Sequence, residues 1–365
     1  MKLVLILAML LSGVAMAQVS YPLNEATWDF HTKAHVFEAH HGEEAVEIAD
    51  GLAVLKEVQF LNGTIEFDVF LSAEQSFPGI RFRGVDKNQM ESFFLRPHLT
   101  GKPDANQAAP VIGGLTAWQL YFGPSYSFPY DYRFDAWTHV KLVVNDNQAQ
   151  VFLDHAKTPH LSWYLKHKPQ AGFVGLGGGF APAHFANVTI DEKATDLVNF
   201  DANEVPKLAS AVGQWDISDK FMETELADLD NLENMIEQRV WPHKMTQEER
   251  GFVNISWDVI RYGSEGDTVF ARVLIESERD QYKRFEFGFS DRAVVLLNGK
   301  PLYKGSKKWR SRDYRYLGTV GFHDSVYLPL KKGQNTLLLA VTEDFGGWLV
   351  GGQFSDQTGI RLTME

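Results

Sequence analysis

The sequence predicts an all-β protein built from two antiparallel β-sandwiches with a short helical segment between them. Short runs in which apolar and polar residues alternate, such as GTIEFDVFL and WTHVKLVVND, recur over residues 51–190 and again from Gly251 onward. Turn pairs such as Asn62-Gly63 and Asn298-Gly299 separate these runs. Short strands and turns at this spacing are typical of antiparallel sandwiches rather than of helical or α/β folds.

The first residues of the chain predict export. The opening MKLVLILAMLLSGVAMAQVS places Lys2 before a short apolar run, which is followed by the small-x-small pattern Ala15-Met16-Ala17. This combination predicts a secretory signal peptide over residues 1–17, cleaved after Ala17. An N-terminal membrane anchor is the alternative, but the apolar run is short for a bilayer span. We therefore expect a periplasmic or extracellular protein that is not an integral membrane protein.

Composition narrows the classes of partner. The chain contains no cysteine, so an exported protein of this kind depends on packed cores rather than on disulfides. Removing Lys2 with the signal peptide leaves 34 basic against 47 acidic residues, a formal charge of −13. An acidic chain disfavours nucleic acid and anionic membranes as partners. The aromatic content of 13% suits sugars, whose C–H faces pack on rings.

The first predicted domain covers residues 18–190 and consists of strands. In the run GTIEFDVFL, the apolar residues Ile65, Phe67 and Val69 alternate with polar ones. Successive side chains of a strand point to opposite faces of the sheet, so this alternation predicts one buried and one wet face. We expect the other runs of this domain to contribute strands to the same sandwich.

A linker and a second β domain follow. Residues 191–210 contain acids, Asn, Pro and Ala without alternation, which predicts a linker, and strands resume in a second domain over residues 211–365. Within residues 218–240, apolar positions recur at steps of three and four residues, which predicts a short helix packed on a core. These positions are Met222, Leu226, Leu229, Leu232, Ile236 and Val240.

The stretch TEDFGGWLVGG near the C-terminus sets two acids beside a tryptophan. Gly346-Gly347 predicts a turn between two strands, with Trp348 packed into the core of the second domain. Glu343 and Asp344 are adjacent, so on a strand they point to opposite faces. A cooperating pair of catalytic acids is therefore not expected here.

The strand and turn phrases resemble two known families. The first domain resembles the concanavalin-A-like lectin/glucanase sandwich, in the laminin-G-like branch with bacterial 3-keto-disaccharide hydrolase domains, through NGTIEFDVFL, GIRFRGVDKNQMESFFLRPH, AWQLYFG, DAWTHVKLVV and GFVGLG. The second resembles the galactose-binding-like jelly roll found beside glycosidase domains, through SDRAVVLLNGKPLYKG, YLPLKKGQNTLLLAV and FGGW. The resemblance implies a carbohydrate-related protein, although such phrases specify fold better than activity.

A catalytic sequence motif known from enzymes with this sandwich fold is incomplete in this chain. Family-16 glycoside hydrolases, which share the sandwich, carry the strand motif Glu-x-Asp-x-x-Glu. Glu66 and Asp68 supply the first two acids, but Leu71 occupies the third position. A retaining glycosidase needs two carboxyl groups on either side of the scissile bond, so we expect these acids to form an ordinary polar strand face.

A polar cluster on the next strands is the main candidate site. Arg81 and Arg83 are two residues apart and so share a sheet face, as do Arg96 and His98. Arginines on facing strands repel one another unless an oxygen-rich group lies among them. We predict a site for carbohydrate or a small oxyanion with His98 as candidate catalytic acid or base. Its predicted substrate-binding residues are Arg81, Arg83, Arg96, Asp104, Gln107, Trp118, Gln119 and Tyr121. The alternative is an internal lattice of salt bridges.

A second sugar site is predicted at the loops of the second domain. Its residues are Asp291, Arg292, Arg312, Asp313 and Tyr316, and the alternative is that the Asp-Arg pairs only hold loops together. No cofactor is expected, although a structural calcium near the acidic loops is possible. His40-His41 beside Glu43-Glu44 is expected to be solvated rather than to bind metal.

Three functions follow from these patterns. The first is an exported carbohydrate-binding protein whose main site is the Arg/His/aromatic face of the first domain. The second is a glycoside hydrolase or lyase acting at the same face. The third is a structural or assembly protein without a small ligand.

Overall fold

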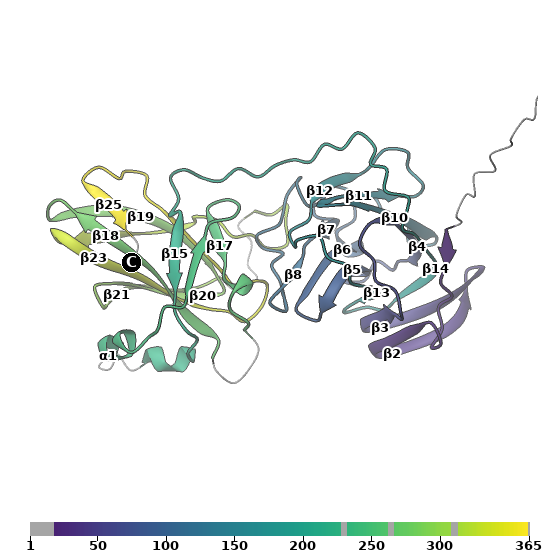
Figure 1. The fold of residues 1–365 in the computed structure, drawn as a ribbon, viewed down its shortest axis with the longest axis horizontal. Coiled ribbons are helices and arrows are strands. Elements are labelled where there is room, and N and C mark those ends of the chain that lie inside the picture. The colour runs from purple at the N-terminus through teal and green to yellow at the C-terminus, as the bar shows by residue number, and fades with distance from the viewer. Residues whose placement is uncertain (1–17, 228–231, 262–265, 308–312, 364–365) are drawn as a thin grey trace, which may run out of the picture.

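The protein forms two β lobes that lie side by side along the long axis of the molecule (Figure 1). A computed structural model describes residues 18–227, 232–261, 266–307 and 313–363. The predicted signal peptide lies outside these residues. Neighbouring strands pair antiparallel in both lobes. The predicted all-β class is therefore confirmed.

One curled sheet of 14 strands makes up the first domain. Its order is β12-β11-β10-β4-β14-β3-β13-β5-β6-β8-β9, and β1, β2 and β7 pair in addition with β14, β3 and β6. Its elements are β1 (Val19–Ser20), β2 (Trp28–His40), β3 (Glu43–Leu55), β4 (Gly63–Phe70), β5 (Gly79–Asp86), β6 (Gln89–Leu95), the 3-10 helix η1 (Pro97–Leu99), β7 (Asn106–Ala108), β8 (Val111–Ile112), β9 (Leu115–Thr116), β10 (Trp137–Asn145), β11 (Gln148–Leu153), β12 (Leu161–Tyr164), β13 (Phe173–Gly178) and β14 (Ala183–Asp191).

The core of the first domain follows the alternation in the sequence. In β4, Ile65, Phe67 and Val69 are buried in one hydrophobic cluster with residues from strands across the sheet. Glu66 and Asp68 lie on the opposite, outward face, where they are only partly buried. The period of two in β4 therefore separates an apolar core from a polar outer face, as predicted.

Two sheets of seven and four strands make up the second domain. The seven-stranded sheet contains β15 (Gln214–Ile217), β16 (His243–Thr246), β18 (Thr268–Ser277), β20 (Arg292–Leu297), β21 (Lys300–Ser306), β23 (Gly333–Thr342) and β25 (Ile360–Thr363). The four-stranded sheet contains β17 (Phe252–Asn254), β19 (Gln281–Ser290), β22 (Asp324–Leu330) and β24 (Leu349–Gln353). Trp215, Phe285 and Trp348 are buried in the cluster that both sheets share.

Two predictions about this domain are confirmed in detail. Asn298 and Gly299 have φ angles of 49° and 77°, the left-handed values that a two-residue hairpin turn between β20 and β21 requires. Trp348 is fully buried, and its indole Nε1 donates a hydrogen bond to the Val341 carbonyl at 3.0 Å. The glycine-rich stretch before it therefore leads into the last core strand.

The helical segment is shorter than its apolar pattern predicts, and it lies after the first strand of the second domain. It consists of the 3-10 helix η2 (Glu223–Ala227) and α1 (Leu232–Glu237), and a further 3-10 helix, η4 (Ile255–Trp257), follows later. Leu232 packs against the sheet as predicted, and Met235 joins it. Met222 and Val240 are exposed, because the helix does not extend to either of them. Leu229 lies outside the described residues.

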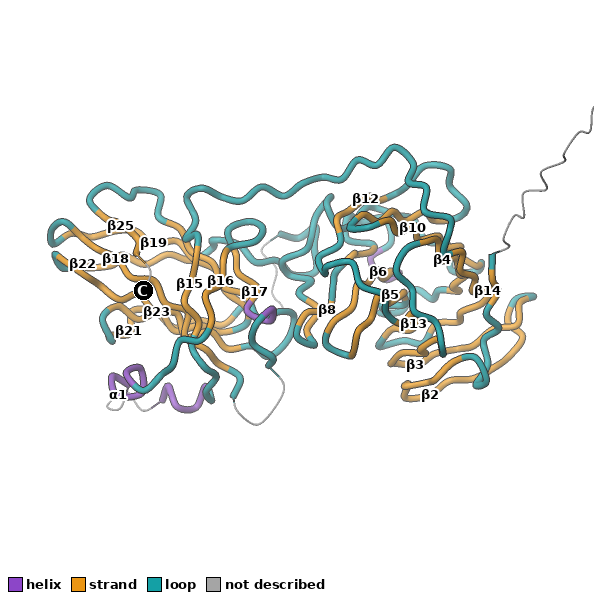
Figure 2. The backbone as a smooth tube through the Cα atoms, in the orientation of Figure 1, coloured by secondary structure: helices purple, strands orange, loops and turns teal. Residues whose placement is uncertain are grey.

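The segment 192–213 contains no strand and runs along both lobes (Figure 2). The boundaries proposed for the linker, 191–210, stay a prediction. No helix among the described residues is long and apolar enough to cross a membrane.

Candidate functional site

Arg96 belongs to a buried lattice rather than to an open surface. Its side chain is 2% exposed, and its guanidinium pairs with the Asp104 carboxylate and donates to the Gln107 side-chain oxygen. The Gln107 amide in turn donates to the carbonyls of Trp118, at 2.8 Å, and Tyr121. Burial lowers the pKa of Arg96, although Asp104 opposes this effect. These contacts match the alternative of an internal salt-bridge lattice.

Three of the predicted ligand-binding residues contact the second domain. Asp104 Oδ2 accepts a hydrogen bond from the backbone N–H of Leu317 at 2.7 Å. Gln119 Oε1 accepts from the Ser290 hydroxyl at 2.5 Å, and the Tyr121 hydroxyl donates to Glu248 Oε2 at 2.8 Å. All three first-domain side chains are buried. These three predicted ligand-binding residues therefore form part of the interface between the domains.

Trp118 lies at the same interface. Its ring centroid is 6.1 Å from that of Phe345. Gly318 and Gly346 make room for the ring, because a Cβ added at either position would meet Trp118 atoms at 2.3 and 2.9 Å. Both glycines have positive φ, so larger residues are disfavoured there on two grounds. Trp118 thus contributes to the fit between the domains.

Arg83 does not share the face of Arg81 in the way its spacing predicts. The pairing of β5 with β6 is irregular between Phe82 and Asp86, and Arg83 has a φ of 50°. Its guanidinium donates to the Leu61 carbonyl at 2.6 Å and to Asn62 Oδ1 at 2.8 Å. The side chain is 3% exposed and holds the loop before β4. Simple alternation fails here because the backbone leaves regular strand geometry.

Arg81 and His98 remain near each other around a group of phenylalanines. The Arg81 guanidinium lies 5.7 Å from the centroid of Phe94. The ring of Phe77 lies 6.1 Å from Phe94 and 5.2 Å from His98. Phe180, which is 64% exposed, lies 5.4 Å from Phe77. We call Arg81, Phe77, Phe94, His98 and Phe180 the Arg81 patch.

The charge of Arg81 has no carboxylate partner among the described residues. The one hydrogen bond found for its guanidinium goes to the Ile80 carbonyl at 3.4 Å. Burial lowers the pKa of Arg81 to about 10, yet the side chain keeps partial contact with solvent. A partly desolvated cation without a counter-ion is costly unless something else supplies oxygen atoms to it. Arg83 and Arg96 of the same predicted site are occupied by buried partners, whereas the guanidinium N–H groups of Arg81 stay available to a ligand.

Glu66 and Asp68 are bridged by a histidine that sequence reasoning missed. His139, on the neighbouring strand β10, places Nδ1 2.7 Å from Asp68 Oδ1 and Nε2 2.9 Å from Glu66 Oε2. Burial alone would lower the pKa of His139, but these two carboxylates raise it to about 9. Hydrogen bonding to His139 lowers the pKa of Glu66. For Asp68 burial acts most strongly and in the opposite direction, but hydrogen bonds from His139 and Asn187 and the nearby histidine charges together lower its pKa. At neutral pH neither acid holds a proton to give to a leaving group.

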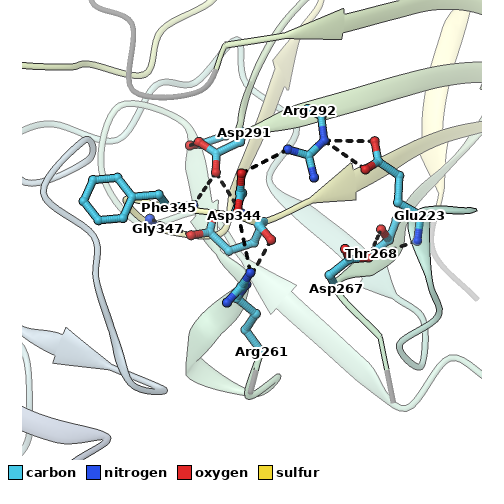
Figure 3. A network of polar contacts seen from close by, with 11 residues as sticks. Glu223, Arg261, Asp267, Thr268, Asp291, Arg292, Asp344, Phe345 and Gly347 are labelled. Carbon is cyan, nitrogen blue, oxygen red and sulfur yellow. Dashed lines mark hydrogen bonds and ion pairs between the residues drawn. The ribbon is translucent and has the colours of Figure 1, made fainter. Parts of the chain in front are cut away.

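The predicted second sugar site divides into two groups of contacts. Asp291 is fully buried, and its Oδ2 accepts from the backbone N–H groups of Asp344, at 2.8 Å, and Phe345, at 2.5 Å. Arg292 Nε donates to both oxygens of Glu223 at 2.9 and 3.0 Å (Figure 3). These two residues therefore hold the loop after β23 and the segment before α1.

The other members of that predicted site contact different partners. Asp313 pairs with the exposed Arg315, with a closest distance of 2.7 Å. Tyr316 is buried, and its ring lies 5.4 Å from Phe122 of the first domain. Arg312 lies outside the described residues. A cavity of about 230 Å³ does lie beside Arg292 and Glu223, and its other walls include Leu226, Val294 and Thr342.

Glu343 and Asp344 have separate surroundings, as predicted. Asp344 faces Arg292 and Arg261, at 3.4 and 3.8 Å (Figure 3). Glu343 is fully buried, and its Oε1 accepts from the backbone N–H of Gly347 at 3.3 Å. Burial, with the nearby charge of Asp291, raises the pKa of Glu343 to about 8. Glu343 is therefore protonated at neutral pH, but it has no access to solvent.

Comparison with known proteins finds similar solved structures but no matching sequence family. No family model and no curated protein matches the chain. It is similar to the solved β-glucanase of Bacillus licheniformis at 10% identity, over 49% of this chain and all of that one, with a TM-score of 0.36. A galectin from Caenorhabditis elegans is similar at 12% identity, over 43% of this chain and 95% of that one, with a TM-score of 0.28.

A third similar structure is a family 35 carbohydrate-binding module from an environmental isolate, at 16% identity, over 27% of this chain and 71% of that one, with a TM-score of 0.21. Sandwiches of the glucanase and galectin type are thus among the solved structures similar to this chain, as the sequence resemblance implies. The strand order itself defines an all-β protein with one sheet of 14 strands in the first lobe and sheets of seven and four strands in the second.

Proposed function

We propose that this protein binds carbohydrate through the Arg81 patch on the first domain. The observation that carries the proposal is the Arg81 guanidinium, which burial desolvates, which belongs to a half-buried residue, and which has no carboxylate partner among the described residues. Guanidinium groups donate several hydrogen bonds in a fixed geometry, which suits hydroxyl or carboxylate oxygens of a saccharide. The neighbouring Phe77 and Phe180 rings offer apolar faces for sugar C–H groups.

Binding fits this patch better than hydrolysis. Burial and the positive charges of Arg96 and Lys102 lower the pKa of His98, so its imidazole is neutral at neutral pH. A neutral imidazole offers a hydrogen bond but no readily donated proton. Asp104, the carboxylate among the residues predicted for this site, is occupied by Arg96 and the Leu317 backbone. The role of His98 as catalytic acid or base stays a prediction that activity assays decide.

Export is part of the proposal. The N-terminal pattern of Lys2, a short apolar run and Ala15-Met16-Ala17 supports a signal peptide cleaved after Ala17 and a periplasmic or extracellular location. N-terminal sequencing of the protein recovered from the medium or periplasm tests this directly. A mature chain that begins at Gln18 is expected, and a chain that retains Met1 in the membrane fraction would contradict it.

The binding proposal is tested with the chain that begins at Gln18. A glycan array containing neutral and acidic saccharides first identifies a ligand, and titration calorimetry then measures its affinity. Arg81→Met keeps the aliphatic stem and removes the charged donors. Since hydrogen bonds to charged groups contribute about 1.5–3 kcal/mol, we expect affinity to fall roughly ten- to a hundredfold.

Arg133→Met is the matched control. Arg133 is an exposed arginine of the same domain that pairs with Asp154 at 3.4 Å, outside the Arg81 patch. Its affinity should equal that of the wild type. Equal affinity in Arg81→Met and the wild type would remove the patch as the binding site, and failure to bind any saccharide would remove the proposed function.

A further inference from the structure

A second cluster of polar residues lies on the outward face of the first domain. Glu38 and His40 come from β2 and His184 from β14, and one ligand-type atom of each lies within 4.8 Å of the others. His184 Nε2 is 2.7 Å from Glu38 Oε1, and His40 Nδ1 is 3.8 Å from the same oxygen. Glu47 of β3, which pairs with His184 in the sheet register, adds an oxygen 3.9 Å from His184 Nε2.

The sheet itself brings these residues together. Glu38 and His40 are two residues apart on β2 and so share a face. β3 lies between β2 and β14 in the sheet, and Glu47 stands on the same outward face as its register partner His184. Three rigid strands therefore position the side chains, which favours a preformed site over a chance surface contact.

The imidazoles of His40 and His184 are packed in an arrangement that leaves a buried ring nitrogen unsatisfied, and a bound cation would offset this loss of free energy. The rings of His40 and His184 are stacked with centroids 3.6 Å apart and planes 12° from parallel. Nε2 of His40 is buried and has no hydrogen-bond partner among the described residues. A buried ring nitrogen without a partner is unfavourable in a finished protein site.

We propose that Glu38, His40 and His184 bind one divalent transition metal ion, with Glu47 or water completing its coordination. Two imidazole nitrogens with one or two carboxylate oxygens are a ligand set that suits Zn²⁺ and related ions. Calcium instead requires six to eight oxygen ligands, which this cluster does not supply.

The surroundings agree with a cation site. The rings of Phe70 and Trp137 lie 4.6 and 6.0 Å from His40 and shield that side of the cluster. The acidic charge of the whole chain also attracts cations.

The sequence pattern suggested different neighbours for His40. His41 and Glu43 follow it in the chain, but His41 stacks on Phe70 at 4.5 Å and Glu43 accepts a hydrogen bond from Asn187 at 3.0 Å. The expectation that this stretch is solvated rather than metal-binding considered only residues that are neighbours of His40 in the chain. The ligand set depends instead on His184, which is distant in the chain and reaches the cluster only through the pairing of β14 with β3.

The test uses the chain from Gln18 after chelator treatment and dialysis. Titration calorimetry with Zn²⁺ should show one strong site, and Co²⁺ should give the visible absorption bands of a four-coordinate nitrogen and oxygen site. His184→Ala, His40→Ala and Glu38→Gln should each weaken binding by about tenfold or more. Circular dichroism and thermal melting confirm that each variant is folded, and three separate variants keep the test decisive if one of them is not.

His31→Ala is the matched control, because His31 is an exposed histidine of the same strand that does not belong to the cluster. This variant should bind Zn²⁺ and Co²⁺ as the wild type does. Absence of a strong site in the wild type, or affinity that is unchanged in all three cluster variants, would overturn the proposal. Neither result bears on sugar binding at Arg81, so the two proposals fail independently.

Discussion

Replacing Glu343 with glutamine tests how burial controls ionisation beside the domain interface. The substitution keeps the size of the side chain and an oxygen that can accept from the Gly347 backbone, but it removes the ionisable proton. Burial and Asp291 raise the pKa of Glu343 from an ordinary 4.5 to about 8 in the folded protein. The unfolded chain therefore loses this proton at lower pH than the folded chain.

The sign of the effect follows from proton binding. Between pH 4.5 and pH 8 the folded state binds more protons at this position than the unfolded state does, so the free energy of unfolding decreases as pH rises. At about 1.36 kcal/mol per pKa unit, the loss across this window is on the order of 5 kcal/mol. For a domain of this size, that corresponds to roughly 10–20 °C in melting temperature. Glu343→Gln should lack this loss.

Calorimetric melting at pH 5, 6.5 and 8.5 gives the measurement. The wild type should lose melting temperature in the second-domain transition as pH rises, and Glu343→Gln should lose distinctly less. Glu204→Gln, an exposed change in the segment between the domains, is the control and should follow the wild type. Parallel pH profiles for the wild type and Glu343→Gln would refute the assignment of a buried, protonated Glu343.

Two further predictions concern the first domain. Arg96→Met leaves the buried Asp104 without its cation, so we expect a loss of about 3–5 kcal/mol in unfolding free energy by urea denaturation, and a loss below 1 kcal/mol would contradict a buried salt bridge. His139→Gln removes a histidine whose folded-state pKa is raised to about 9. That histidine stabilises the fold fully below its ordinary pKa of 6.5, and the contribution is lost as pH rises through 9. The wild type should therefore lose melting temperature between pH 6.5 and pH 9.5, and His139→Gln should lose less. A matching decline in both proteins would show that His139 is not the group that titrates.

The fold was predictable because strand patterns are local. Alternation of Ile65, Phe67 and Val69 indicates the core face of β4, and Asn298-Gly299 indicates a hairpin, with no knowledge of the rest of the chain. The contacts between polar side chains were harder to predict, because they depend on the pairing of strands that are far apart in the sequence. Nothing near His139 in the sequence shows that β10 sets it between Glu66 and Asp68.

The interface between the two domains explains why other predicted ligand-binding residues have structural contacts instead. The polar residues Asp104 and Gln119 have the composition of a ligand rim when the first domain is considered alone. Sequence does not show that a second domain covers them and supplies partners such as Leu317 and Ser290. Arg83 differs for a local reason, since its positive φ interrupts the alternation on which its predicted face depends.

The segment 192–213, which runs along both lobes, also has a thermodynamic consequence. A tether of about 20 residues holds the two domains at an effective concentration in the millimolar range, so their docking is an intramolecular equilibrium. An interface whose intrinsic dissociation constant is only millimolar would already be closed about half of the time in the intact chain. Separately produced domains at micromolar concentration would then stay apart. Failure of the isolated halves to associate is therefore compatible with a closed, two-domain protein.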